Sequence, residues 1–131
     1  MIHVMVVTPD PQTNTLLRNA MAGLENLETE WVTSETEALA RLKGKRNHLV
    51  ISDETLAEMT GIEFLNQLVR VNPFINTVLL SSLSPHDFHE ATEGLGILGQ
   101  LPLKPEPSHL KDLLSSLSSI LRLSAPEADK K

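Results

Sequence analysis

Three side chains in the sequence have the chemical types needed to transfer a phosphoryl group to a carboxylate. Asp53 follows the run HLVIS, Ser81 follows the run NTVLL, and Lys104 follows the run ILGQLPL. A carboxylate can attack phosphorus, a hydroxyl can hydrogen-bond one phosphoryl oxygen, and an ammonium group can neutralise another. This chemistry requires the three side chains to meet, so the elements that carry them must place them at one site.

The spacing of apolar residues predicts strands that alternate with helices along the whole chain. Apolar runs of strand length occur at residues 2–7, 29–33, 48–52, 76–80 and 97–103. Apolar residues at helical spacing follow these runs at residues 13–24, 35–45, 62–71, 84–96 and 109–123. Ser34 and Glu37 predict a capping box at the start of the second helix, and Pro102 is compatible with a strand only at a sheet edge.

This alternation predicts a single α/β domain with a doubly wound, five-stranded parallel sheet in a three-layer (βα)5 sandwich. Parallel neighbours need crossover connections, and helices must then cover both faces of the sheet. Sites in such sheets lie outside the carboxyl ends of the strands, where Asp53, Ser81 and Lys104 all fall. We expect the domain to span residues 1–123 and residues 124–131 to form a disordered tail.

Composition and charge argue against several classes of function. The 131-residue chain has no cysteine, so disulfides and thiolate metal sites are excluded. Its net charge is -6, and it has no basic cluster beyond RLKGKR, which argues against a nucleic-acid-binding surface. The N-terminal MIHVMVV is too short for a signal peptide, and no run approaches the roughly 20 apolar residues of a membrane span. We therefore expect a soluble, cytoplasmic domain that binds proteins and has no contact with membranes.

Over residues 2–123 the sequence resembles the receiver domain of two-component response regulators. LVISD matches the strand that ends at the phospho-accepting aspartate of that family, here Asp53, and Gly61 matches a glycine eight residues later. Ser81 in VLLSS matches the Ser/Thr switch position, and Lys104 in LPLKP matches a Lys-Pro pair whose peptide bond is commonly cis. The resemblance implies the flavodoxin-like receiver fold and a phosphorelay signalling protein rather than an enzyme.

The resemblance also implies a Mg²⁺ site, but the chain has only part of the ligand set. Receivers hold Mg²⁺ with the phospho-accepting residue, here Asp53, with a backbone carbonyl that would belong to Thr55, and with two acids after the first strand. Thr8 and Pro9 stand in the places of those two acids, and Asp10 is the only acid in that loop. Mg²⁺ prefers six oxygen ligands in octahedral geometry, so with Asp10 as the candidate third ligand we expect Mg²⁺ to bind weakly or not at all.

Two functions of the domain remain open from the sequence. In the first, Mg²⁺-dependent phosphorylation of Asp53 is weakened but still draws Ser81 and Lys104 toward the phosphoryl group, shifting a balance of loop arrangements. In the second, the domain is a phosphorylation-independent pseudo-receiver that serves as a protein-interaction module. Leu101 stands at the aromatic switch position of the family, so the rotating Tyr or Phe is absent.

The resemblance implies protein partners of two kinds. A histidine kinase or phosphotransfer protein would act on Asp53. An output protein or a second copy of the chain would bind the face made by the fourth predicted helix (84–96), the fifth strand (97–103) and the fifth helix (109–123).

Two alternative kinds of site are not supported by the residues. A flavin or nucleotide site would need glycine in the loop TPDPQTNT and aromatic side chains for stacking, but that loop has no glycine and the chain has only three Phe and one Trp. A hydrolase or phosphatase would need a second acid near its nucleophile, and only Asp10 is available.

Overall fold

The computed structural model describes residues 1–43 and 47–124, so the tail predicted for residues 124–131 lies outside the described residues except at its first position. Strands and helices alternate as predicted. The strands are β1 (Ile2–Val7), β2 (Leu27–Val32), β3 (Leu49–Ser52), β4 (Asn76–Leu80) and β5 (Gly99–Leu101). The helices are α1 (Pro11–Met21), α2 (Glu35–Leu42), α3 (Gly61–Val71), α4 (Pro85–Ala91) and α5 (Pro107–Ser124).

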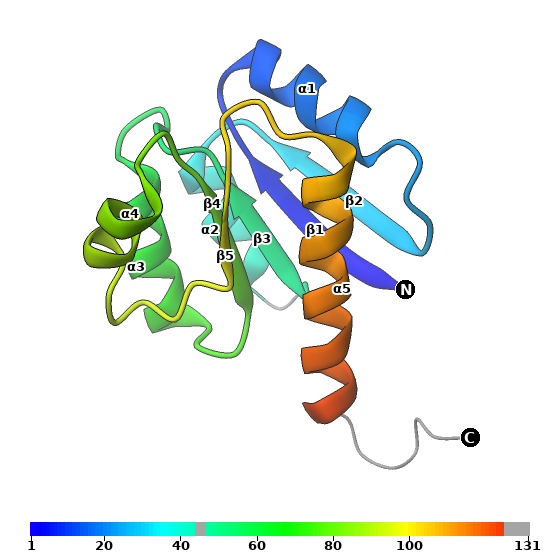
Figure 1. Ribbon diagram of the computed structural model, residues 1–131. Coiled ribbons are helices and arrows are strands. Elements are labelled where there is room, and N and C mark those ends of the chain that lie inside the picture. Colours follow the sequence, from blue (N-terminus) through cyan, green and yellow to red (C-terminus); the bar gives the residue numbers. More distant parts are fainter. Residues whose placement is uncertain (44–46, 125–131) are drawn as a thin grey trace.

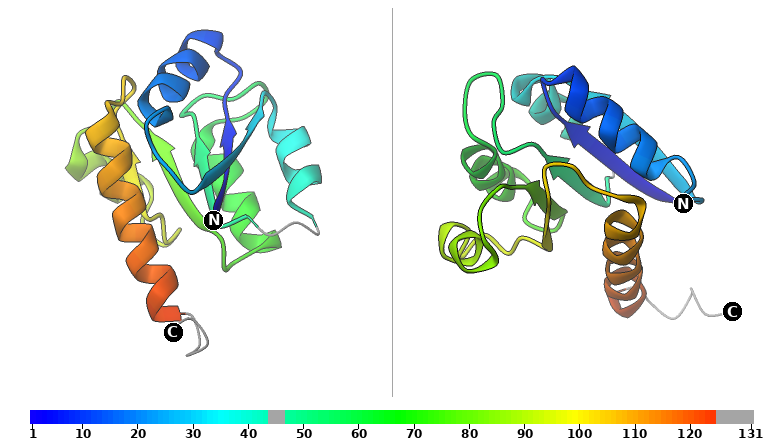
Figure 2. Two further views of the ribbon diagram at one scale, coloured as in Figure 1. Left: turned by 90° about the vertical axis from the view of Figure 1, so that its right-hand side faces the viewer. Right: turned by 45° about the horizontal axis from the view of Figure 1, so that its top comes forward.

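The five strands form one parallel sheet in the order β2-β1-β3-β4-β5 (Figure 1). Helices α1 and α5 cover one face of the sheet, and α2 and α3 cover the other, which gives the three layers visible in Figure 2. The predicted flavodoxin-like, doubly wound fold is therefore confirmed. No helix in the described ranges has both the length and the apolar character needed to cross a membrane.

The strands are apolar on both faces because each face packs against helices. Val4, Val6 and Ile51 belong to the core cluster beneath α1 and α5. Met5 and Val50 alternate with them and belong to the cluster beneath α2 and α3. This alternation follows from the two-residue period of side chains along a strand, and it holds the central strands in register.

The boundaries of the fourth predicted helix and of the fifth predicted strand differ from the structure. Helix α4 ends at Ala91 rather than at residue 96, and Gly94 and Gly96 adopt φ angles of 88° and 66° beyond it. Such left-handed angles are open to glycine and end a helical path. Strand β5 covers only Gly99–Leu101 and stops before Pro102, which has no N–H to donate to a neighbour. Its position at the edge of the sheet is confirmed.

Side chains at the first turns of α2 and α3 fix where these helices begin. The Ser34 side chain accepts a hydrogen bond from the Glu37 N–H, as predicted. The reciprocal contact predicted for Glu37 is wrong, because its carboxylate pairs with Arg41 at 2.7 Å one turn later. A complete capping box is found instead at α3, where Thr60 and Glu63 bond each other's backbone N–H groups.

Helix α3 starts so close to the end of β3 that only glycine fits at its first position. A Cβ atom added to Gly61 would overlap the backbone carbonyl oxygen of Asp53 and would lie 2.6 Å from Cδ1 of Leu79. The Gly61 N–H also donates to the carbonyl oxygen of Glu54 at 2.9 Å. The glycine eight residues after Asp53 therefore sets the distance between α3 and the site-bearing strand.

We predict that Gly61→Ala lowers the free energy of unfolding by at least about 2 kcal/mol, because the new methyl group must displace backbone in a packed site. Urea unfolding followed by circular dichroism measures this loss. Gly23→Ala is the matched control, since no atom lies within 4 Å of a Cβ added there, and its stability should equal that of the wild type or exceed it. A Gly61→Ala variant as stable as the wild type would contradict the close approach of α3 to the backbone of Asp53.

Candidate functional site

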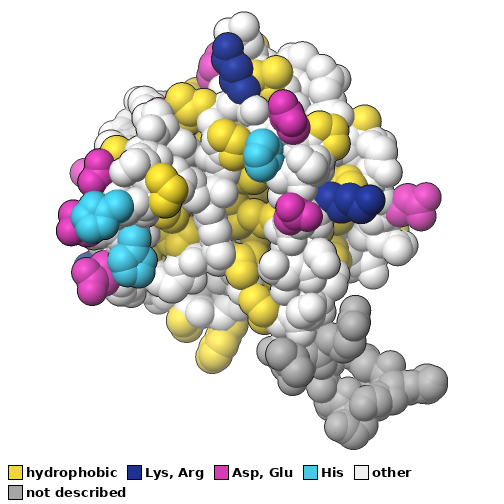
Figure 3. Space-filling model, viewed as in Figure 1, with side chains coloured by type: hydrophobic (Ala, Val, Ile, Leu, Met, Phe, Trp, Pro, Cys, Tyr) yellow, Lys and Arg dark blue, Asp and Glu magenta, His cyan; other side chains and the backbone are white. Residues whose placement is uncertain are grey.

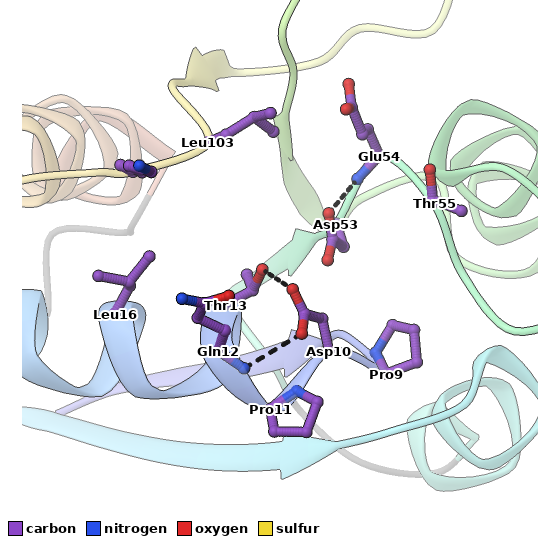
Figure 4. Close-up of a pocket in the computed structure, with 11 residues that line it drawn as sticks. Pro9, Asp10, Pro11, Gln12, Thr13, Leu16, Asp53, Glu54, Thr55 and Leu103 are labelled. Atoms are coloured by element: carbon purple, nitrogen blue, oxygen red, sulfur yellow. Dashed lines mark hydrogen bonds between the residues drawn. The ribbon is translucent and has the colours of Figure 1, made fainter.

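Asp53 lies where the carboxyl ends of three neighbouring strands meet. Val7 of β1 pairs in register with Ser52 of β3, so Thr8 and Asp53 follow at adjacent strand ends. A pocket of about 600 Å³ opens at this edge (Figure 4). It is lined by Pro9, Asp10, Pro11, Gln12, Thr13, Leu16, Asp53, Glu54, Thr55, Leu103 and Lys104.

Both oxygens of the Asp53 carboxylate accept hydrogen bonds from neighbouring protein groups. The Thr8 hydroxyl donates to Oδ2 at 2.7 Å, and the Glu54 backbone N–H donates to Oδ1 at 2.7 Å. Asp53 is only 8% exposed, and a carboxylate removed from water needs such donors to stay charged. Thr8 is itself buried, so the hydroxyl and the carboxylate are held together away from solvent.

Asp10 acts as the N-cap of α1. Its Oδ1 accepts from the Gln12 N–H at 3.1 Å and its Oδ2 accepts from the Thr13 hydroxyl at 2.9 Å, as the dashed lines in Figure 4 show. Asp10 lines the same pocket as Asp53 and Thr55, but both of its oxygens are engaged by the first turn of its own helix.

The carboxylate oxygen atoms at this edge are not arranged to bind Mg²⁺. The ion needs several oxygens free to point at one centre with near-octahedral geometry. The carboxylates of Asp53 and Asp10 are hydrogen-bonded to other groups, and the Glu54 carboxylate accepts from Ser82. Across the described residues, the one group of three acidic or histidine side chains close enough to share a metal ion lies on α4 and includes none of the residues that line the pocket.

Ser81 directly follows β4 and is buried, and its hydroxyl is directed into its own loop. Its Oγ accepts a hydrogen bond from the Leu83 N–H at 3.0 Å, and Ser81 is 4% exposed. The Gln100 side chain of β5 donates to the Leu83 carbonyl at 2.8 Å and to the Ser81 carbonyl at 3.4 Å. Ser81 is not among the residues that line the pocket, so the structure brings Asp53 and Lys104 to one pocket and holds Ser81 beside it.

Lys104 lines the pocket but forms no hydrogen bond or ion pair with any other described residue. Its side chain is exposed, and the bond to Pro105 is trans, since no described peptide bond is cis. Leu101, three residues earlier, is 1% exposed and belongs to the core beneath α5. The position of the family's aromatic switch residue is thus filled by an apolar side chain that packs inward.

Two site residues were not identified from the sequence in the roles that the structure gives them. The sequence places Thr8 where the family has an acid and does not identify it as a hydrogen-bond donor, although its position one residue after a strand that pairs with β3 is a signal that it reaches Asp53. Glu54 had no such signal. Its contact with Ser82 depends on the path of two loops that are 28 residues apart in sequence.

The comparisons with known proteins give the family and the fold of this chain. The sequence profile of the response regulator receiver domain matches residues 4–115. No match is found among curated protein sequences. A response regulator from Legionella pneumophila superposes with a TM-score of 0.76 and 21% identity, over 91% of this chain and 99% of that one.

Two further solved structures share the fold. A chemotaxis response regulator of Vibrio cholerae superposes with a TM-score of 0.76 and 23% identity, over 89% of this chain and 98% of that one. The RcsB response regulator of Salmonella typhimurium superposes with a TM-score of 0.81 and 18% identity, over 91% of this chain. This chain spans 62% of the length of the Salmonella protein. By its sequence profile, supported by its sheet order, the chain belongs to the response regulator receiver domain family.

Proposed function

We propose that this receiver domain works mainly as a protein-interaction module, with Asp53 in the phospho-acceptor position but phosphorylated only slowly by Mg²⁺-dependent transfer. The observation that carries the proposal is the 2.7 Å hydrogen bond from Thr8 to the Asp53 carboxylate. In this arrangement a neutral hydroxyl satisfies the oxygen that a receiver with two further acids would turn toward a cation. The hydrogen bond from Thr8 therefore stabilises the unphosphorylated form of Asp53.

The charges around Asp53 also oppose phosphoryl transfer. A phosphodonor is an anion, and it would approach a pocket edge that carries the carboxylates of Asp10, Asp53 and Glu54. Among the described residues, Lys104 is the one cationic side chain that lines the pocket, and a single ammonium group offsets a single charge. Like charges brought close in a partly buried site repel strongly, so labelling of Asp53 should be slow.

The surface between β5 and α5 supports a role in binding a protein partner. A groove of about 280 Å³ runs between these elements, and Leu98, Leu101 and Leu113 supply its apolar lining. His109 and Asp112 of α5 also line it. Figure 3 shows apolar side chains exposed along this face beside α5. An apolar centre with polar groups around it is typical of protein interfaces.

The partners that fit the proposal are cytoplasmic proteins of the same signalling class. A histidine kinase or phosphotransfer protein would recognise the pocket edge at Asp53. An output protein, or a second copy of this chain, would occupy the face made by α4, β5 and α5.

We predict that Thr8→Val lowers the free energy of unfolding by about 1–3 kcal/mol, because it leaves a buried carboxylate oxygen without its donor. Thr8→Ser is the matched control, since it keeps the hydroxyl and should lose less than about half as much. Thermal unfolding followed by the fluorescence of Trp31, the one tryptophan of the sequence, measures both variants. Equal losses in the two variants would show that the hydrogen bond to Asp53 is unimportant.

We predict that Mg²⁺ binds at least roughly tenfold more weakly than to a receiver that has both acids, a difference of about 1.4 kcal/mol or more. The double variant Thr8→Asp with Pro9→Asp should tighten binding, because it restores two carboxylates at the end of β1. NMR titration of the amides around Asp53 measures both affinities. Wild-type affinity equal to that of an ordinary receiver would be evidence against the proposal.

We predict that acetyl phosphate with Mg²⁺ labels Asp53 slowly or not at all, as followed by mass spectrometry of the intact protein. Asp53→Asn is the control for labelling elsewhere. The Thr8→Asp, Pro9→Asp variant should be labelled faster than the wild type. Rapid, stoichiometric labelling of the wild type that disappears in Asp53→Asn would overturn the proposal and make this domain a phosphorylation switch.

A further inference from the structure

The carboxylate of Glu54 reaches from the end of β3 to the loop that follows β4. Its Oε1 accepts a hydrogen bond from the Ser82 N–H at 3.0 Å and a longer one from the Ser82 hydroxyl at 3.3 Å. Ser82 directly follows Ser81, which stands at the switch position. The carboxylate of Glu54, the residue after Asp53, thus already accepts a hydrogen bond from a backbone N–H just beyond β4.

The backbone of Glu54 is fixed at both of its polar groups. Its N–H donates to Oδ1 of Asp53 at 2.7 Å, and its carbonyl accepts from the Gly61 N–H at 2.9 Å. One residue therefore connects Asp53, the start of α3 and the β4–α4 loop. Because the main chain of Glu54 is held on both sides, its side chain presents the carboxylate to Ser82 from a defined position.

We propose that the Glu54 carboxylate is a built-in anion that holds the β4–α4 loop in one arrangement without a phosphoryl group on Asp53. The inference rests on the proposed function, in which Asp53 is rarely phosphorylated. A phosphoryl group would deliver negative charge at the end of β3 and attract donors at the end of β4. Glu54 supplies negative charge at the end of the same strand, and Ser82 supplies the donors.

Other contacts hold this loop from its opposite side, so the contribution of Glu54 has to be measured separately. Gln100 bonds the carbonyls of Ser81 and Leu83, and the Ser81 hydroxyl accepts from the Leu83 N–H. None of these bonds involves the Ser82 N–H. Exchange of that single amide hydrogen with solvent therefore reports on the contact with Glu54.

The test is hydrogen exchange of the Ser82 amide measured by NMR in wild type, Glu54→Ala and Glu54→Gln, with no phosphodonor present. We expect Glu54→Ala to accelerate exchange at least about threefold, since it removes a charge-assisted acceptor. Glu54→Gln keeps an oxygen acceptor without the charge and should give an intermediate rate. Glu58→Gln is the control, because Glu58 lies in the same β3–α3 loop as Glu54 and its exposed side chain bonds no other described residue.

Each outcome decides one part of the inference. Exchange in Glu54→Ala within twofold of the wild-type rate would show that Glu54 does not hold the loop. Exchange in Glu54→Gln equal to the wild type would show that the charge is not what matters. Because no phosphodonor is present, these results are independent of Asp53 labelling. Rapid labelling by acetyl phosphate would refute the proposed function and leave the measured Glu54–Ser82 contact unchanged.

Discussion

The carboxyl edge of the sheet around the pocket is organised by the buried carboxylate of Asp53. Asp53 is largely removed from water, and an ionised carboxylate in that position is costly unless donors surround it. Its two donors come from Thr8 and from the backbone of Glu54. Strand register places the first, and the hydrogen bond from Gly61 to the Glu54 carbonyl helps to place the second. The pairing of β1 with β3 and the starting point of α3 thus both help to position the groups that donate hydrogen bonds to Asp53.

The sequence predicted the sheet, its helices and the strand ends that carry Asp53, Ser81 and Lys104, because the period of apolar residues determines these features. It did not predict which hydrogen bonds the polar residues make once they arrive there. Asp10 has the chemical type of a metal ligand, but capping the helix that begins at the next residue competes for the same oxygens. The contact between Glu54 and Ser82 joins two loops, and apolar periodicity says nothing about loop paths.

The solved structures similar to this chain show that the fold is compatible with very different sequences. They share less than a quarter of their residues with this chain, yet superpose over about nine tenths of it. The core depends on apolar packing between strands and helices, so polar residues at the strand ends can vary without altering the fold. Function in this architecture belongs to the site rather than to the scaffold, and the proposed function of this domain rests on Thr8 and Pro9 at the end of β1.

The division of the core into two faces has a consequence for the order of folding during synthesis. Every buried member of the cluster beneath α2 and α3 lies between Met5 and Leu79. The opposite cluster also needs residues from Leu101 to Leu117. A nascent chain of about 80 residues can therefore bury the core beneath α2 and α3, while the other side of the sheet is covered by α1 alone until α5 leaves the ribosome. An uncovered apolar sheet face promotes aggregation, so α5 protects the growing protein as well as completing it.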